Sequence, residues 1–347
     1  MTESFTFAFP GRLELNTGGY AYDRRVMAGL AIHGFQASVM PLGDGFPAPS
    51  DAVLAGAEKR LSALPDETLV LVDGLAFGVL DGWAAREGMR LKIVALVHHP
   101  LALETALAVE ERNALTEREA RALSFARHVV VTSHTTAREL AARYGVAPQA
   151  ITVALPGTDP APRAMGENDI PRILSIGTLT HRKGHDILLD ALKKVEDRAW
   201  VASIIGSRDL DPATATALKT QLNGLGLEGR VTFQGEIADT RQALAAADIF
   251  ALASRYEGYG MVFAEALAQG LPIVACDAGA VPDVVPPEAG ILVPVDDADT
   301  FADALRRLLT DPQERRRRAE AAFQAGLALP RWNDTAATMA GVLGAIR

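Results

Sequence analysis

Cysteine is almost missing from this chain, since Cys276 is the single one among 347 residues. A lone cysteine excludes an intramolecular disulfide and a cysteine-rich metal site. Its place in the apolar run 273–276 predicts a small buried core residue and not a nucleophile. Long apolar runs are missing too, because no stretch of about 18 residues lacks a charge, so the sequence predicts no membrane span.

Positive charge is in the minority, with 34 lysines and arginines against 43 aspartates and glutamates and a formal net charge of −9. This balance argues against a nucleic-acid partner, which would need a basic face. Residues 1–7 lack the basic segment and apolar core of a secretory signal, so we expect a cytoplasmic protein. The basic run Arg315–Arg318 is interpreted as a solvated helix face. Peripheral contact with an anionic inner-membrane surface is the alternative.

Hydrophobic residues make up 49% of the chain, which is typical of a folded globular protein, and the length suits two domains. Short, near-continuous apolar runs alternate with helical patterns, as in sheets of buried parallel strands. The sequence therefore predicts an α/β fold. The expected strands are 5–9, 37–42, 68–72, 92–98, 128–132, 151–154, 172–176, 199–205, 230–234, 248–252, 272–275 and 289–293. The expected helices include 20–32, 52–64, 105–125, 136–144, 185–195, 212–225 and 300–310.

A passage rich in proline and glycine, 156–162, is followed by the polar segment 166–169 before strands resume. This is the chemistry of a linker. We therefore expect one domain over residues 1–160, a second over 166–328 and a helical tail over 329–347.

The segment Glu257-Gly-Tyr-Gly-Met-Val-Phe-Ala-Glu265 is the most informative one in the chain. A glycine turn that leads into a helix presents unpaired N–H groups and the positive end of the helix dipole, which favours phosphate. A carboxylate in the same helix would repel phosphate and is better suited to accept hydrogen bonds from ribose or sugar hydroxyls. Together these features indicate a nucleotide sugar. Glycine turns and first-turn glutamates are also ordinary helix chemistry, so the segment alone leaves a structural interpretation open.

Four other segments stand in a regular order around this one: Asn16–Tyr20, Pro156–Asp159, Ile176–His185 and the tail from Trp332. Together, the five segments resemble the retaining glycosyltransferases of the GT-B fold, the family 4-like, group 1 enzymes with a Glu–seven residues–Glu signature. The resemblance covers nearly the whole chain. It implies two Rossmann-like, doubly wound domains that face each other across a cleft. The first would bind the acceptor, the second would bind the donor, and the C-terminal helix would cross back toward the first.

The resemblance implies a donor site built largely by the second domain. Lys183 would supply positive charge to the diphosphate as its leaving-group charge grows. The family usually has an arginine where this chain has Thr178, and Arg182 is the candidate replacement. Glu257 would hold hydroxyls of the donor sugar near the reacting carbon, and Glu265 would accept hydrogen bonds from the ribose.

Backbone groups complete this expected donor site. Glycine after the first strand would let the backbone approach the diphosphate closely, and the amides at the start of the helix would cradle it. The residues in question are Gly18, Gly19, Gly258, Tyr259, Gly260, Met261 and Val262.

His98 completes the expected catalytic set with Glu257 and Lys183. It follows an expected strand of the first domain, and residues at the carboxyl ends of parallel strands face the ligand crevice. The resemblance places it near the donor sugar or the acceptor, while an ordinary turn histidine is the alternative. Asp73 also ends a strand and is a weaker candidate for an acceptor contact. The pattern Asp209-Leu-Asp211 is interpreted as a helix cap. We expect no metal and no cofactor besides the donor.

The resemblance implies transfer of a sugar from a nucleoside diphosphate sugar to an acceptor hydroxyl, with retention at the anomeric carbon and without a metal. The acceptor is unknown and belongs to the saccharides, the lipid-linked sugars or the small molecules. A GT-B epimerase or phosphorylase is the alternative within the fold. A catalytically silent nucleotide-sugar-binding protein is another, for which Thr178 is a hint. A nicotinamide-dependent dehydrogenase is disfavoured because no clean G-x-G-x-x-G follows the first strand.

Overall fold

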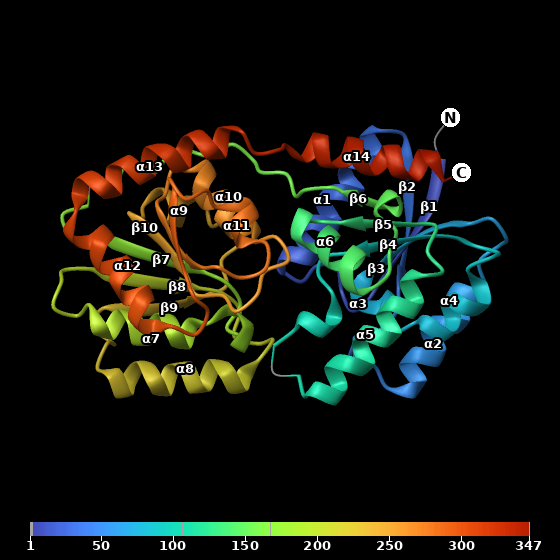
Figure 1. Ribbon diagram of the computed structural model, residues 1–347, viewed down its shortest axis with the longest axis horizontal. Helices are drawn as coiled ribbons and strands as arrows, with labels where there is room; N and C mark the ends of the chain where they lie inside the picture. Colours follow the sequence, from blue (N-terminus) through green and yellow to red (C-terminus); the bar gives the residue numbers. More distant parts are fainter. Residues whose placement is uncertain (1–2, 106, 167, 347) are drawn as a thin grey trace. The chain divides into compact units, whose positions relative to one another are not determined.

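The computed structural model describes residues 3–105, 107–166 and 168–346. Contacts between residues divide the chain into two compact units (Figure 1). Unit 1 comprises Met1–Gly157 and Pro330–Arg347, and unit 2 comprises Thr158–Leu329. Each unit holds one six-stranded sheet whose neighbouring strands run parallel. The predicted α/β class with parallel sheets is confirmed.

The sheet of unit 1 has the strand order β2-β1-β3-β4-β5-β6. Its strands are β1 (Glu3–Phe9), β2 (Phe35–Pro41), β3 (Leu69–Asp73), β4 (Lys92–Val97), β5 (His128–Val131) and β6 (Ile151–Val153). The helices of the unit are α1 (Gly18–Ile32), α2 (Asp51–Ser62), α3 (Gly74–Phe77), α4 (Asp81–Glu87), α5 (Val109–Leu123), α6 (His134–Arg143) and α14 (Trp332–Ala345), with short 3₁₀ turns η1 (Leu101–Leu103) and η2 (Pro148–Ala150).

The sheet of unit 2 has the order β12-β11-β10-β7-β8-β9. Its strands are β7 (Arg172–Ile176), β8 (Val201–Ile205), β9 (Val231–Gly235), β10 (Ile249–Leu252), β11 (Ile273–Cys276) and β12 (Gly290–Val293). The helices are α7 (His185–Lys194), α8 (Pro212–Leu225), α9 (Arg241–Ala245), α10 (Met261–Ala268), α11 (Val281–Val284), α12 (Ala298–Thr310) and α13 (Pro312–Leu327), and the 3₁₀ turn η3 covers His181–Lys183.

The order of the strands creates one switch point in each sheet. In unit 1 the chain moves from β1 to β2 on one side and returns to β3 on the other. In unit 2 it moves from β7 to β8 and β9, and then returns to β10 on the opposite side of β7. At such a point the loops that leave the two neighbouring strands diverge to opposite faces and leave a crevice at the carboxyl edge, where ligands of α/β proteins bind.

Each expected strand is present, and its ends lie within two residues of the expected ones. The expected helix 105–125 begins later, at Val109, and residue 106 lies outside the described residues. Its start is set by Glu111, whose carboxylate accepts a hydrogen bond from the N–H of Ala108 at 3.0 Å. A carboxylate in the first turn also suits the helix dipole.

Cys276 lies at the end of β11 and is 1% exposed, as expected for a core residue. Burial raises the pKa of its thiol to about 12. The thiol therefore stays protonated at neutral pH, and it lacks the thiolate that a nucleophile needs.

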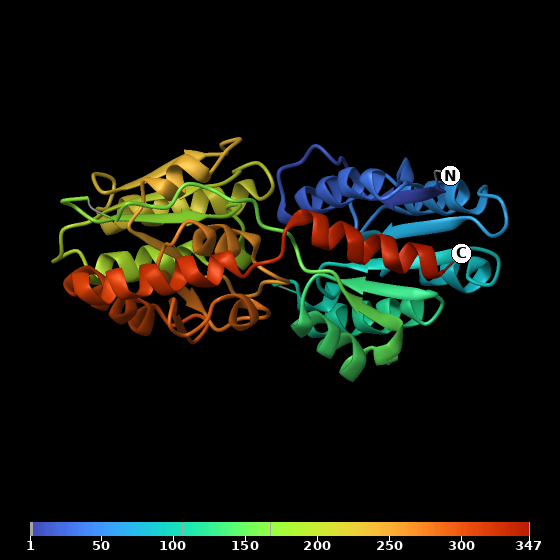
Figure 2. The ribbon, with the colours of Figure 1, turned by 90° about the horizontal axis from the view of Figure 1, so that it is seen from above.

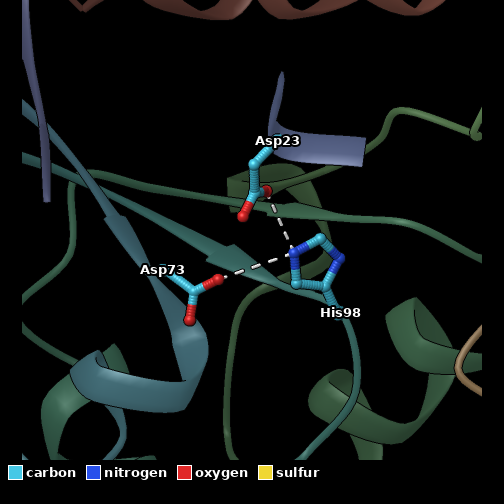
Figure 3. Close-up of side chains that lie close together, drawn as sticks. All are labelled: Asp23, Asp73 and His98. Carbon is cyan, nitrogen blue, oxygen red and sulfur yellow. Dashed lines mark hydrogen bonds and ion pairs between the residues drawn. The ribbon is translucent and has the colours of Figure 1, made fainter. Parts of the chain in front are cut away.

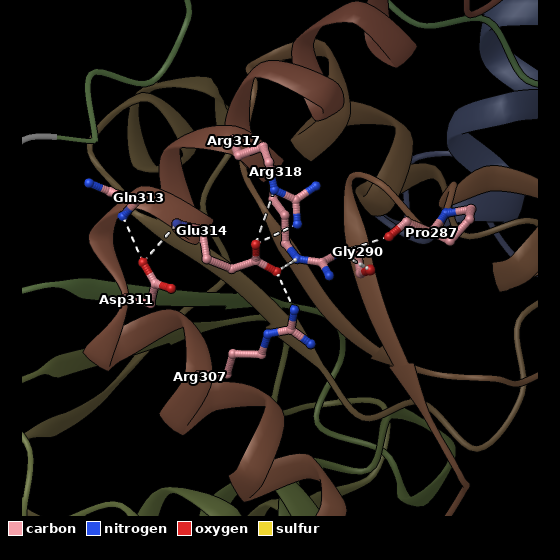
Figure 4. Close-up of polar contacts among 8 residues, drawn as sticks. All are labelled: Pro287, Gly290, Arg307, Asp311, Gln313, Glu314, Arg317 and Arg318. Carbon is pink, nitrogen blue, oxygen red and sulfur yellow. Dashed lines mark hydrogen bonds and ion pairs between the residues drawn. The ribbon is translucent and has the colours of Figure 1, made fainter.

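Figure 4 shows how the basic run 315–318 is held in the structure. Arg318 is buried, and it donates hydrogen bonds to Glu314 Oε1 at 2.8 Å and to the carbonyls of Pro287 and Gly290. Arg317 is exposed and also pairs with Glu314. The interpretation as a solvated helix face is therefore wrong for Arg318, which ties α13 to the loop before β12. Among the described residues, no helix combines the length and the apolar character that a membrane crossing requires.

The C-terminal helix α14 packs along α1 within unit 1 (Figure 2). Trp332 meets the ring of Tyr22 edge-on at 5.9 Å, and Thr335 Oγ1 donates to the carbonyl of Leu155 at 2.7 Å. The two helices approach most closely at Gly29, where an added Cβ would lie 2.5 Å from the Cβ of Ala336.

We expect Gly29→Ala to destabilise unit 1 by about 1–3 kcal/mol, because overpacking must push α14 away from α1. Gly341→Ala is the matched control: it also lies inside a helix, but an added Cβ there has nothing within 4 Å. The control should be stabilising by about 0.5–1 kcal/mol, the usual gain from Gly to Ala in a helix. Urea unfolding measures both, and equal stabilisation by the two substitutions would contradict the close packing.

Candidate functional site

The loops after β7 and β10 meet at the switch point of unit 2. The two strands pair in parallel through Ile173 and Ile249, so their carboxyl ends lie side by side. Gly184, in the first loop, has a φ of +62°, and a Cβ on it would lie 1.9 Å from the carbonyl oxygen of Ala253 in the second loop. Only glycine fits such an approach, because no other residue lacks the Cβ. The sequence thus brings the two loops into direct contact.

Glu257 lies in the second loop and is only 5% exposed. Its Oε1 accepts hydrogen bonds from Lys183 Nζ at 2.6 Å and from Ser254 Oγ at 2.6 Å. Its Oε2 lies 3.5 Å from Arg182 Nη1, which also donates to the carbonyl of Tyr256 at 3.0 Å. Neighbouring side chains in a loop need not point the same way, yet here Arg182 and Lys183 converge on one carboxylate.

Two cations decide the charge of this buried carboxylate. Burial would raise the pKa of Glu257, but Lys183 and then Arg182 oppose it, and together with the hydrogen bonds from Lys183 and Ser254 they hold the pKa below its usual value. Glu257 is therefore ionised at neutral pH. Two cations, Lys183 and Arg182, therefore lie beside this one carboxylate, where the sequence predicts the donor diphosphate.

The helix α10 begins directly after this loop. Gly260 caps it with a φ of +91°, a conformation that favours glycine, and a Cβ there would lie 2.6 Å from the ring of Phe263. Gly279 packs closely against this loop, because a Cβ on Gly279 would lie only 2.3 Å from the carbonyl oxygen of Glu257. The first N–H groups of a helix have no partner within it, so the start of α10 can donate hydrogen bonds to an anion.

Glu265 lies one turn into α10 and is partly buried. Burial raises its pKa to about 7, with the carboxylates of Asp159 and Asp239 adding to the rise and Arg241 opposing it. Its charge is therefore sensitive to pH in the physiological range. An acceptor of this kind can bind the hydroxyls of a ribose.

Unit 1 holds a second cluster at its own switch point (Figure 3). His98 follows β4, and its Nε2 lies 3.2 Å from Asp23 Oδ1 and 3.6 Å from Asp73 Oδ2. Burial would lower the pKa of His98, but Asp23 and then Asp73 raise it above its usual value. The imidazole thus lies between two carboxylates that favour its protonated form.

Both glycines of the first loop lie at the start of α1, beside this cluster. Thr17 caps the helix, and a Cβ on Gly19 would lie 3.5 Å from the imidazole of His98. The ring of Tyr22 meets the imidazole edge-on at 5.3 Å. Gly18 has nothing within 4 Å of an added Cβ, so its backbone is open to a ligand.

Sequence reasoning missed Asp23, although a signal was present. Asp23 is 1% exposed and lies on the buried face of α1 with Tyr22, Val26 and Leu30. A charged residue on the buried face of an amphipathic helix needs a partner, but the spacing of residues along the helix does not identify that partner. Ser254 was missed as well, since a serine at the end of a strand carries no signal of its own.

Asp23, Asp73 and His98 also offer ligand atoms that all lie within 4.8 Å of one another, but the protonated imidazole described above has no lone pair to give to a metal ion. Asp211, by contrast, accepts hydrogen bonds from the N–H and the hydroxyl of Thr214 and caps α8, as expected.

Two family models match the chain one after the other. "Glycosyltransferase Family 4" matches residues 23–162, and "Glycosyl transferases group 1" matches residues 170–311. The chain belongs to this glycosyltransferase family. The first match contains His98, and the second contains Lys183 and the whole segment 257–265.

Curated relatives are similar to this chain over part or most of its length. The lipopolysaccharide core biosynthesis mannosyltransferase LpsB of Rhizobium meliloti is 32% identical over 178 residues, 50% of this chain and 47% of the relative. The MMP alpha-(1->4)-mannosyltransferase of Mycolicibacterium hassiacum is 28% identical over 321 residues, 86% of this chain and 75% of the relative. The chain spans less than half of the two Rhizobium meliloti relatives it matches, 43% of LpsE and 47% of LpsB.

Solved structures show the same fold. Sucrose-phosphate synthase from Thermosynechococcus elongatus has a TM-score of 0.82 at 22% identity, with 97% of this chain and 98% of that chain covered. HepE of Anabaena in complex with UDP-glucose has a TM-score of 0.78 at 19% identity, with 98% and 99% covered. The predicted GT-B fold is confirmed for this chain.

We expect Asp23→Asn to lower the pKa of His98. The substitution removes the negative charge of the nearer carboxylate, while the asparagine side chain keeps nearly the same shape as the aspartate. Titration of the histidine ring signals by NMR measures the shift. A histidine whose pKa is raised by folding adds stability that is present below its unfolded pKa of about 6.5 and is lost as the pH rises through the folded value. The variant should lose part of this stabilisation, and an unchanged His98 titration would contradict the ion pair.

We expect nucleoside diphosphate affinity to rise as Glu265 ionises around pH 7, since a charged acceptor binds ribose hydroxyls more strongly than a neutral one. The gain between pH 6 and pH 8 should be about fivefold, or about 1 kcal/mol. Calorimetry on the wild type and on Glu265→Gln separates this effect from the titration of the phosphates, which both proteins share. The same pH dependence in both would rule out Glu265 as its source.

Proposed function

We propose that this protein transfers a sugar from a nucleoside diphosphate sugar to an acceptor hydroxyl, with retention at the anomeric carbon and without a metal ion. The observation that carries the proposal is the group formed by Arg182, Lys183 and Glu257 beside the start of α10. This group places two cations and a helix N-terminus next to a carboxylate. The cations and the helix N-terminus suit a phosphate, and the carboxylate suits sugar hydroxyls, so the group can bind both parts of a nucleotide sugar.

Unit 2 supplies the groups that this donor requires. The amides of residues 258–262 and the side chains of Arg182 and Lys183 would bind the diphosphate, and Glu265 would bind the ribose. The absence of an arginine at Thr178 is offset by Arg182, whose guanidinium reaches Glu257. Relatives support this class of donor, because two mycobacterial ones are named as GDP-mannose-dependent mannosyltransferases and HepE is seen with UDP-glucose.

The reaction needs positioning and charge stabilisation more than an acid or base. The bond from the anomeric carbon to the phosphate oxygen breaks, and the acceptor oxygen forms its bond on the same face of the sugar. The departing phosphate oxygen takes the acceptor proton, so protons and charges balance. Lys183 and Arg182 would stabilise the negative charge that grows on the phosphate, which is where such contacts accelerate a reaction. Unit 1 would bind the acceptor, and His98 is the candidate residue of that unit.

Stereochemistry and metal use test the reaction class directly. UDP-glucose and GDP-mannose, each incubated with the full chain in EDTA, should release or transfer sugar whose first-formed anomer is α, as ¹H NMR detects before mutarotation. A β product would contradict retention. Activity that appears only after Mn²⁺ or Mg²⁺ is added would contradict the metal-independent mechanism. Cleavage of the donor that requires added inorganic phosphate and no acceptor would indicate a phosphorylase instead.

Lys183→Ala and Glu265→Ala should separate turnover from donor binding. Lys183→Ala removes a charge used most in the transition state, so we expect kcat to fall by about 100-fold. Glu265→Ala removes a binding contact, so we expect the donor KM to rise by about tenfold with kcat nearly kept. Lys193→Ala is the control and should match the wild type, because Lys193 is a partly exposed lysine of α7 that pairs with Glu196. Wild-type kinetics in both test variants would refute the assignments.

A further inference from the structure

Arg255 lies in the loop after β10 and reaches across to the loop after β7. The reaction proposed above assigns it no role. Its side chain is 10% exposed. The guanidinium makes a two-pronged pair with Asp186, at 3.0 and 2.7 Å, and its Nε donates to Asp296 Oδ1 at 2.7 Å. Asp186 opens α7, and Asp296 precedes α12. One side chain therefore joins three separate segments of unit 2.

The same residue also holds the backbone in front of Lys183. Arg255 Nη1 donates to the carbonyl of His181, and its own backbone N–H donates to the carbonyl of Arg182 at 2.8 Å. The two peptide units just before Lys183 are thus both tied to Arg255. In return, Arg182 Nη1 donates to the carbonyl of Tyr256, the residue that follows Arg255. These contacts fix the positions of the two loops relative to each other.

Backbone conformation shows that this position is closely constrained. Asp296 has a φ of +60°, which residues other than glycine rarely adopt, and Gly184 has a φ of +62° where a Cβ would strike the opposite loop. Such conformations persist where the surroundings over-determine them. The contacts of Arg255 with two carboxylates and two carbonyls help to hold these two backbone conformations in place.

We propose that Arg255 is a positioning residue that sets the place of Lys183 relative to Glu257 and so prepares the diphosphate site. The inference rests on the proposed function, because it assigns Lys183 to the donor diphosphate. A planar guanidinium is required for the two-pronged pair, and a lysine cannot reproduce it. Without this pair, the loop that carries Lys183 keeps its charge but loses its fixed place, and a misplaced charge binds the diphosphate less well.

A double-mutant cycle tests whether Arg255 acts through Lys183. Calorimetry gives the Kd of UDP and of GDP for wild type, Arg255→Lys, Lys183→Ala and the double variant. We expect Arg255→Lys to weaken binding of the preferred nucleotide by about tenfold in the wild-type background and by less than about twofold when Lys183 is absent. Equal weakening in both backgrounds would overturn the proposal, because it would show a general structural effect. Unchanged affinity in Arg255→Lys would overturn it too.

Arg318→Lys is the matched control, since Arg318 is also a buried arginine of unit 2 that pairs with a carboxylate and two backbone carbonyls. It should lower the melting temperature as Arg255→Lys does while leaving the Kd within about twofold of the wild type. If Arg255→Lys does not fold, Asp186→Asn loosens the same pair and takes its place in the cycle. Failure of both UDP and GDP to bind the wild type would contradict the proposed function itself.

Discussion

The contact between Lys183 and Glu257 is the interaction on which the candidate donor site depends. It joins the loop after β7 to the loop after β10 through a 2.6 Å bond that is largely shielded from water. Burial alone would raise the pKa of the carboxylate, and the neighbouring cations keep Glu257 ionised. Arg182 then adds a second cation beside the same carboxylate. The start of α10 lies directly beside this group.

Sheet topology explains why these residues meet although they are 74 positions apart in the chain. β7 and β10 are neighbours because the chain returns to the centre of the sheet after β9, and their loops therefore leave at one switch point. The same rule operates in unit 1, where Asp73 at the end of β3 and His98 after β4 join Asp23 on the helix that follows β1. The two units thus place different chemistry at equivalent positions: two cations around one carboxylate, and two carboxylates around one cation.

Much of this could be predicted from the sequence, because apolar runs mark buried strands and glycine marks the turns that lead into helices. The expected strands and the glycine turn before α10 follow from local patterns of this kind. The partners of a side chain do not. Nothing near Asp23 in the sequence indicates His98, and nothing in the run 315–318 indicates that Arg318 turns inward to bind Glu314 and two carbonyls. Arg255 is similar, since its partners come from two other segments, 181–186 and Asp296, which only the tertiary fold brings close to it.

The most direct test of the account is a crystal structure of the full chain with a bound nucleoside diphosphate, UDP or GDP. The account predicts that the phosphates contact Lys183 and the amides of residues 258–262, with the ribose hydroxyls on Glu265. In that complex Lys183 Nζ should lie within hydrogen-bond distance of a phosphate oxygen. A nucleotide bound elsewhere, with Lys183 still held only by Glu257 and no phosphate at the start of α10, would contradict it.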